Sequence, residues 1–151
     1  MKTLKQLCNG KPSAALRAMR DGIQEHDAAG GKIDMDDFLA TYDNGLYICA
    51  TTCALQKLKG KQITYEALGP DFMGSNAEFS EFWGSTPDDL GRFEMAMDYA
   101  CEGSLGSLSR YMGANLPADL REHDLLITTE GWRAQLPELS RVIEKLEAAG
   151  F

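Results

Sequence analysis

The sequence lacks any long apolar segment. No run approaches the ~18 apolar residues that would span a bilayer, and the N-terminal stretch carries Lys2 and Lys5 with no apolar core behind them. A secretory signal requires such a core. We therefore expect no membrane association and a cytoplasmic location.

Basic residues are scarce relative to acidic ones. Lys and Arg number 15 against 23 Asp and Glu, which gives a formal net charge of −8, and the basic residues are scattered along the chain. Binding to a phosphate backbone needs a cluster of positive charge. The negative net charge and the scattered basic residues argue against a nucleic-acid partner. They suit a soluble protein with a basic protein partner.

Catalytic and metal-binding motifs are also missing. The sequence has no Glu-x-x-His pair for a di-iron centre, no Gly-x-Ser-x-Gly nucleophile turn, and no Gly-Lys-Ser/Thr ending on its glycine stretch at 103–107. The acidic cluster at 34–37 lacks the glycine and glutamate of a calcium loop. The absence of these motifs argues against an enzyme, and we expect no cofactor.

What the chain does contain is the composition of an ordinary globular protein. Hydrophobic residues make up 44% and charged residues 25%, values that disfavour disordered and fibrous classes. A chain of 151 residues buries about two-thirds of its unfolded surface and can fold without metals or disulfides. We expect a single domain, residues 1–151.

Helix signals dominate the sequence. Thr86 followed by Pro87 is typical of a helix start, and apolar residues then recur every three or four positions as far as Met112. Gly103 and Gly106 interrupt this pattern and indicate a kink or a close crossing. Further helices are expected over residues 12–28, 38–58, 65–68, 75–83, 117–127 and 137–149.

Two helix ends carry specific signals. Ser75 with Glu78 forms a capping box at the start of the 75–83 helix. Pro137 is expected to open the C-terminal helix, and Gly150 followed by Phe151 predicts a Schellman-type ending. Together, these helix signals predict an all-α fold, an irregular or orthogonal bundle of six or seven helices.

An α+β fold is the alternative. Residues 46–52 and 63–68 are rich in β-branched side chains and could pair as a small hairpin near 46–68. If the fold is all-α, the helices expected over 38–58 and 86–112 are central and can cross closely through their small residues. Gly45, Cys49 and Cys53 of the first helix would then contact Ala100, Gly103 and Ser107 of the second.

Residues 45–56 form the most informative segment. Within a regular helix Cys49 and Cys53 lie on one face, about 5–6 Å apart at Cβ, which is too far for an internal disulfide. Apolar surroundings disfavour a reactive thiolate. We interpret the pair as core packing unless residues 43–45 break the helix just before Cys49, which would favour redox chemistry.

A metal site is the other interpretation of these cysteines. His26 and His123 both follow apolar helical stripes, and with Cys49 and Cys53 they would supply the four ligands of a tetrahedral zinc site. No two of these residues have zinc-finger spacing. Cys8 and Cys101 complete the four cysteines, which fit reduced thiols better than a disulfide framework.

Aromatic side chains gather over residues 72–83. This segment carries Phe72, Met73, Phe79, Phe82 and Trp83, which either close the core or form a contact surface for a partner or for a second copy in a homodimer.

Three hypotheses for the function follow. The first is an acidic interaction or regulatory protein that binds a protein partner through the aromatic segment or an acidic helical face. The second is a thiol-dependent or metal-binding protein that uses Cys49 and Cys53. The third is a bundle with a small-ligand pocket lined by Met95, Met97, Tyr99 and the histidines.

Overall fold

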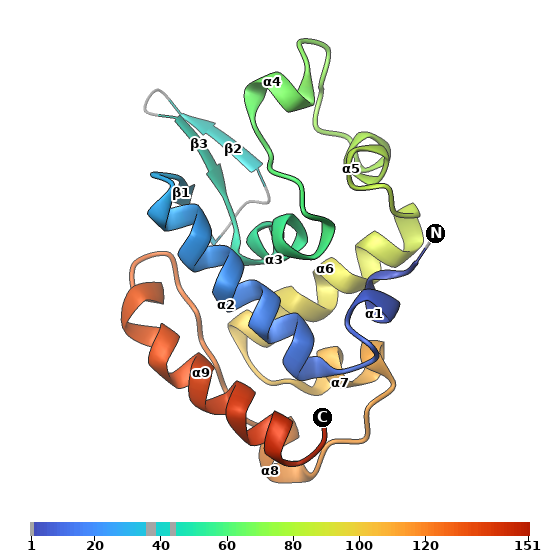
Figure 1. The fold of residues 1–151 in the computed structure, drawn as a ribbon, viewed down its shortest axis with the longest axis vertical. Coiled ribbons are helices and arrows are strands. Elements are labelled where there is room, and N and C mark those ends of the chain that lie inside the picture. Colours follow the sequence, from blue (N-terminus) through green and yellow to red (C-terminus); the bar gives the residue numbers. More distant parts are fainter. Residues whose placement is uncertain (1, 36–38, 43–44) are drawn as a thin grey trace.

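The structure is a computed structural model that describes residues 2–35, 39–42 and 45–151, and within them it is predominantly helical (Figure 1). The helices are α1 (Leu4–Leu7), α2 (Pro12–Ala28), α3 (Ala50–Lys59), α4 (Tyr65–Leu68), α5 (Asn76–Trp83), α6 (Pro87–Glu102), α7 (Gly106–Met112), α8 (Ala118–Arg121) and α9 (Trp132–Ala148). Three of these, α1, α4 and α8, are four-residue turns. The prediction of a helical bundle is confirmed.

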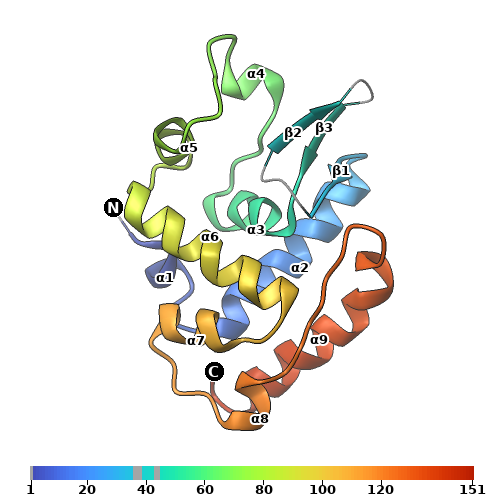
Figure 2. The ribbon, with the colours of Figure 1, turned by 180° about the vertical axis from the view of Figure 1, so that it is seen from behind.

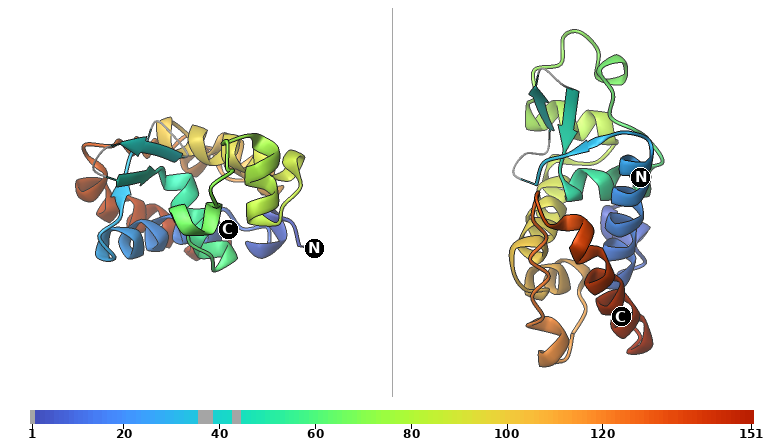
Figure 3. Two further views of the ribbon diagram at one scale, coloured as in Figure 1. Left: turned by 90° about the horizontal axis from the view of Figure 1, so that it is seen from above. Right: turned by 90° about the vertical axis from the view of Figure 1, so that its left-hand side faces the viewer.

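Helix α2 runs through the middle of the molecule, with α3 and α6 on one side and α9 on the other (Figures 1 and 2). Its most extensive packing is against α3. The two backbones touch at Gly22, where an added Cβ would lie 2.2 Å from the carbonyl oxygen of Cys53. The molecule is flattened, as the two side views show (Figure 3).

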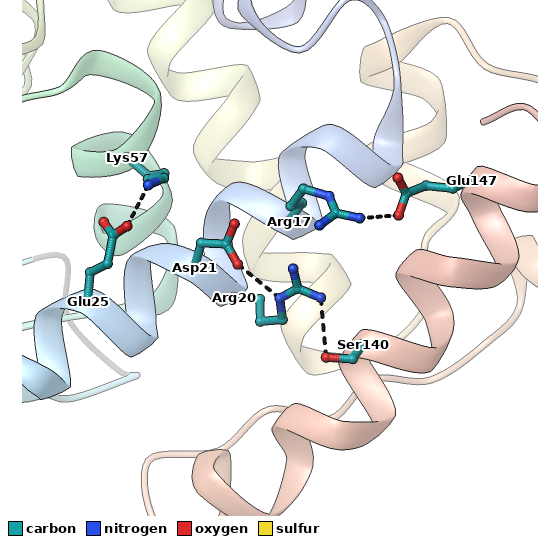
Figure 4. Close-up of polar contacts among 7 residues, drawn as sticks. All are labelled: Arg17, Arg20, Asp21, Glu25, Lys57, Ser140 and Glu147. Carbon is teal, nitrogen blue, oxygen red and sulfur yellow. Dashed lines mark hydrogen bonds and ion pairs between the residues drawn. The ribbon is translucent and has the colours of Figure 1, made fainter.

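Polar side chains hold α2 against both neighbours (Figure 4). The contacts are Arg17 with Glu147, Arg20 with Asp21 and Ser140, and Glu25 with Lys57. Most of these groups are well exposed, so each pair contributes little to stability. Their effect is to fix the rotation of α2 between α3 and α9.

A small sheet precedes α3. Its strands β1 (Lys32–Ile33), β2 (Leu39–Tyr42) and β3 (Gly45–Ile48) have the order β1-β3-β2, and β3 pairs parallel with β1 and antiparallel with β2. The prediction of a helix over 38–58 is therefore wrong for residues 39–42 and 45–48, and residues 38, 43 and 44 lie outside the described part of the chain. The hairpin alternative is right about a strand at residues 46–48 but wrong at 50–52, which begin helix α3. Its second strand is also wrong, because Thr64 caps helix α4 at 65–68.

The long helix expected over 86–112 is divided in two. Helix α6 starts as predicted, with Thr86 as the N-cap and Pro87 in the first turn, and it ends at Glu102 before Gly103. Helix α7 then begins at Gly106. The two glycines thus mark a break rather than a kink, since each lowers the stability of a helix interior by about 1 kcal/mol.

The helix expected over 117–127 is only the single turn α8. Beyond it the backbone is irregular, and the N–H groups of Leu125 and Ile127 donate to the carbonyl oxygens of Gly103 and Cys101. The last carbonyls of α6 need such donors. This pairing holds the segment against the end of α6 and prevents a longer helix.

Helix α9 begins at Trp132, five residues before the predicted start at Pro137. Pro137 lies inside the helix, where it lacks an N–H to donate. Burial of the Trp132 ring, with the Arg133 guanidinium 4.3 Å from its centroid, offsets that loss. The predicted Schellman ending is confirmed by a 2.8 Å bond from Phe151 N to Leu146 O.

The first turn of α2 is completed from the far end of the sequence. The N–H of Ser13 donates to the carbonyl oxygen of Phe151 at 3.2 Å, so the residue that closes α9 also satisfies an N-terminal donor of α2. Buried hydrophobic residues from all parts of the described chain form one cluster. Among the described helices, none has the length and apolar character to cross a bilayer.

Candidate functional site

Cys49 is the residue at which strand β3 gives way to helix α3. It is the N-cap of α3, and its Sγ accepts the N–H of Thr52 at 3.4 Å. The helix therefore starts directly after Cys49, which the helical pattern had placed in a helix interior. Of the predicted break at 43–45, Gly45 begins β3, and Asp43 and Asn44 lie outside the described residues.

A cleft opens at this end of α3, and we call it the α3–α6 cleft. It has a volume of about 290 Å³ and lies where the start of α3, the end of α6 and the loop that follows α8 meet (Figure 2). Its lining residues are Met35, Cys49, Ala50, Thr51, Asp98, Cys101, Glu102, Leu126, Ile127, Thr128 and Thr129.

The charge of the cleft comes from α6. Asp98 and Glu102 are one turn apart on the helix, and none of the described lining residues is basic. The hydroxyl of Thr51 donates to Asp98 Oδ1 at 2.9 Å. Burial raises the pKa of Asp98, the Thr51 hydrogen bond lowers it, and the nearby charge of Glu102 raises it further. The cleft is acidic, and no described residue supplies a cation to it.

The thiols of the cleft are held in the protonated form. Burial raises the pKa of Cys49 to about 11, against the lowering effect of its hydrogen bonds with Thr52. Burial also raises the pKa values of Cys101 and Cys53, and all four cysteines are free and buried. A nucleophilic role requires a lowered thiol pKa, so the start of α3 does not activate Cys49.

The outer rim of the cleft is a loop fixed by the Gln135 side chain. Its amide donates to Leu126 O and accepts from Thr128 N, and Thr129 Oγ1 accepts from Met35 N at 2.8 Å. Leu126 has φ of 48° and is 52% exposed. A positive φ is unfavourable for a bulky residue, and such strain is concentrated at functional sites.

The histidines do not join the cysteines. His26 Nε2 lies 3.1 Å from Lys32 O, its ring packs over Gly31, and burial lowers its pKa. His123 Nε2 lies 3.0 Å from Glu138 Oε1 on α9. Among the described residues no group of three or more His, Cys, Asp or Glu side chains could hold a metal ion, so the predicted zinc ligands are not assembled.

The aromatic segment packs against the core as well as upon itself, since Trp83 belongs to the core cluster and Phe79 and Phe82 pack against it. Phe72 and Phe79 meet edge to face at 5.0 Å, as do Phe82 and Trp83 at 4.8 Å, and Trp83 is buried. Met73 is the one member of the five that is fully open, at 86% exposed. These contacts use much of the apolar area that an interface would need.

The methionine pocket is not assembled either. Met97 is buried in the core, whereas Met95 and Tyr99 are 61% and 54% exposed on the outer side of α6. Helices α3 and α6 contact each other, but the predicted crossing of two long helices is not formed, because Gly45 lies in β3 and Ser107 lies in α7. A close backbone contact of α3 is instead with Gly22 of α2.

Sequence reasoning missed the acidic residues of the site. Met95, Asp98, Tyr99 and Glu102 follow the spacing of one helix face, and this signal could have identified an exposed apolar and acidic stripe. The role of Leu126 has no comparable signal, because it depends on the pairing of Leu125 and Ile127 with the end of α6.

No family model, curated protein or solved structure matches this chain. The assignment of a function therefore depends on the chemistry of the cleft and its surroundings.

Proposed function

We propose that this protein is a binding protein whose α3–α6 cleft receives a lysine or arginine side chain from a basic segment of a partner protein. The observation that carries the proposal is the pair of carboxylates, Asp98 and Glu102, that face a cleft with no described basic lining residue. A carboxylate with no cation beside it in its own protein contributes the most binding free energy when a partner protein supplies the cation.

The size of the cleft supports a side chain rather than a large cofactor. Pockets for small molecules measure about 300–1,000 Å³, and this cleft of about 290 Å³ is at the lower limit. Thr51, Thr128 and Thr129 add hydroxyl groups that can accept the remaining N–H donors of an ammonium or guanidinium group.

The rim supports contact with the residues that flank the inserted side chain. Leu126 lines the cleft and is 52% exposed, and apolar side chains beside a charged group are typical of interfaces. The net charge of −8 attracts a basic protein and increases its association rate. The protonated thiols favour binding over catalysis.

The cellular location is part of the proposal. Four free, buried thiols suit a reducing compartment, so we infer a cytoplasmic binding protein.

The test uses a capped tripeptide with one lysine between two leucines, titrated into the uniformly ¹⁵N-labelled protein. The expected result is a set of amide shifts confined to residues 49–51, 98–102 and 126–129. A peptide with norleucine in place of lysine should bind about tenfold more weakly, because it leaves the carboxylates unpaired.

Variants of the carboxylates complete the test. Glu102→Gln should weaken the lysine peptide about fivefold or more, whereas Glu144→Gln, an exposed acid on α9, should leave its affinity unchanged. Equal affinity of the lysine and norleucine peptides would refute the proposal. Equal affinity of butylamine and the lysine peptide would identify a free amine, rather than a protein segment, as the occupant.

A further inference from the structure

A second pocket lies where α5 packs against the first half of α6, and we call it the Glu94 pocket. It has a volume of about 320 Å³. The described residues that line it are Leu39, Gly74, Asn76, Phe79, Ser80, Pro87, Leu90, Gly91 and Glu94. None of them lines the α3–α6 cleft, so the two sites are separate.

Helix α6 turns one face toward this pocket. Pro87, Leu90, Gly91 and Glu94 all line it, and their spacing of three and four residues places them on the same side of the helix. Gly91 leaves this face open, because a Cβ there would meet nothing within 4 Å. The open space therefore lies one turn from Glu94, on the face that carries its side chain.

The Glu94 carboxyl has no partner within the described chain. It is partly buried, and no described residue forms a hydrogen bond or an ion pair with it. Burial, followed by the charge of Asp98 one turn later, raises its pKa to about 7. The described lining residues from α5 and β2 carry no ionisable group. A carboxylate in this position is stabilised by a cation that enters the pocket.

The remaining walls are mainly apolar. Phe79, Pro87 and Leu90 line the pocket, and the face of an aromatic ring attracts an ammonium group. The Ser80 hydroxyl donates to Asn76 O at 2.8 Å, within α5. A mostly apolar pocket with one strong polar group is typical of a small-molecule site.

We propose that the Glu94 pocket binds a small primary amine, whose ammonium group pairs with the Glu94 carboxylate and whose apolar body packs against Phe79 and Leu90. The volume of about 320 Å³ is near the lower limit of about 300 Å³ for small-molecule pockets, so the body is compact, such as a single ring.

Benzylamine is a suitable probe, with benzyl alcohol as its uncharged counterpart. In a titration of ¹⁵N-labelled protein, benzylamine should shift the amides of residues 74–80 and 88–94. Its affinity should be about tenfold higher at about pH 8 than at about pH 6, because the ionised fraction of Glu94 increases about tenfold over this range. Benzyl alcohol should bind about fivefold or more weakly at about pH 8, with no increase with pH.

Two variants separate the charge from the space. Glu94→Gln should lower the affinity for benzylamine about tenfold at about pH 8 and abolish its increase with pH. Gly91→Leu keeps the carboxylate, fills the open space with a residue that favours a helix, and should lower the affinity about fivefold or more. Glu144→Gln, an exposed acid on α9, is the matched control and should retain full affinity.

Three results would overturn the proposal: no binding of benzylamine, equal affinity of Glu94→Gln and Glu144→Gln, or equal affinity of benzylamine and benzyl alcohol. Amide shifts of residues 74–80 and 88–94 with the lysine tripeptide but not with benzylamine would assign the pocket to a protein side chain and would also overturn it. Binding of the tripeptide at the α3–α6 cleft is independent of each of these results.

Discussion

The Thr51 hydroxyl donates a 2.9 Å hydrogen bond to Asp98 Oδ1 and so joins the first turn of α3 to α6. Thr51 is buried, and the pKa of Asp98 is raised by burial and lowered by this bond. One contact therefore links α3 to α6 and also opposes the effect of burial on the pKa of Asp98.

Thr51→Val tests this contact, because it keeps the shape and removes the donor. We expect a loss of about 1–3 kcal/mol in the free energy of unfolding at neutral pH. The loss should be smaller in acid, because the Thr51 hydroxyl forms a weaker hydrogen bond with the protonated Asp98 than with its carboxylate. Urea denaturation across the pH range measures it, and a loss that does not vary with pH would contradict this account.

Glu94 provides a second test of the acidic side of α6. Burial, followed by the charge of Asp98, raises its pKa to about 7. The folded protein then holds the proton more tightly than the unfolded chain, so this group contributes stability below about pH 4.5 that is lost as pH rises to about 7.

Glu94→Gln removes this dependence. The variant should be more stable than the parent by about 1–2 kcal/mol at about pH 8 and no more stable at about pH 4. Thermal unfolding at the two pH values measures the difference. Glu144→Gln, on an exposed side chain of α9, should change stability equally at both.

Gly22 and Gly91 form a matched pair of helix glycines. A Cβ at Gly22 would lie 2.2 Å from Cys53 O, whereas a Cβ at Gly91 in α6 meets nothing within 4 Å. Gly22→Ala should lower stability by about 3 kcal/mol or more, because two backbones must separate. Gly91→Ala should raise it by about 0.5–1 kcal/mol. Equal effects would show that α2 and α3 are not in close contact.

Cys49 should behave as a cap rather than as a reactive group. With a pKa of about 11, roughly one thiol in a thousand is ionised at about pH 8, so native-state reaction with Ellman's reagent should be far slower than in the denatured protein. Cys49→Ser should be about 1 kcal/mol more stable than Cys49→Ala, since serine is a better N-cap. Rapid native labelling would restore the thiol hypothesis.

Local signals predicted much of the helical framework. The span of α2, the caps at Ser75 and Thr86, and the ending at Phe151 all depend on residues a few positions apart. Strand β3 appeared only in the α+β alternative, because Leu46, Tyr47 and Ile48 fit a helical period equally well. Their pairing with β1 and β2 makes them a strand.

The candidate sites were harder to foresee than the fold. Cys49 was identified, but Asp98 and Leu126 reach the same cleft from segments far away in the sequence. Their convergence depends on the break at Gly103 and on the pairing of residues 125–127 with the end of α6. Such long-range backbone contacts leave no periodic signal in one sequence.

The bond from Ser13 to Phe151 also constrains the order of events during synthesis. A ribosome releases the chain from its N-terminus onward, so α2 emerges long before the residue that completes its first turn. Until Phe151 is available, that turn lacks its partner and α2 lacks the covering helix α9. Final consolidation of the central helix must therefore follow the synthesis of Phe151, and nascent chains stalled short of α9 should remain sensitive to protease at α2.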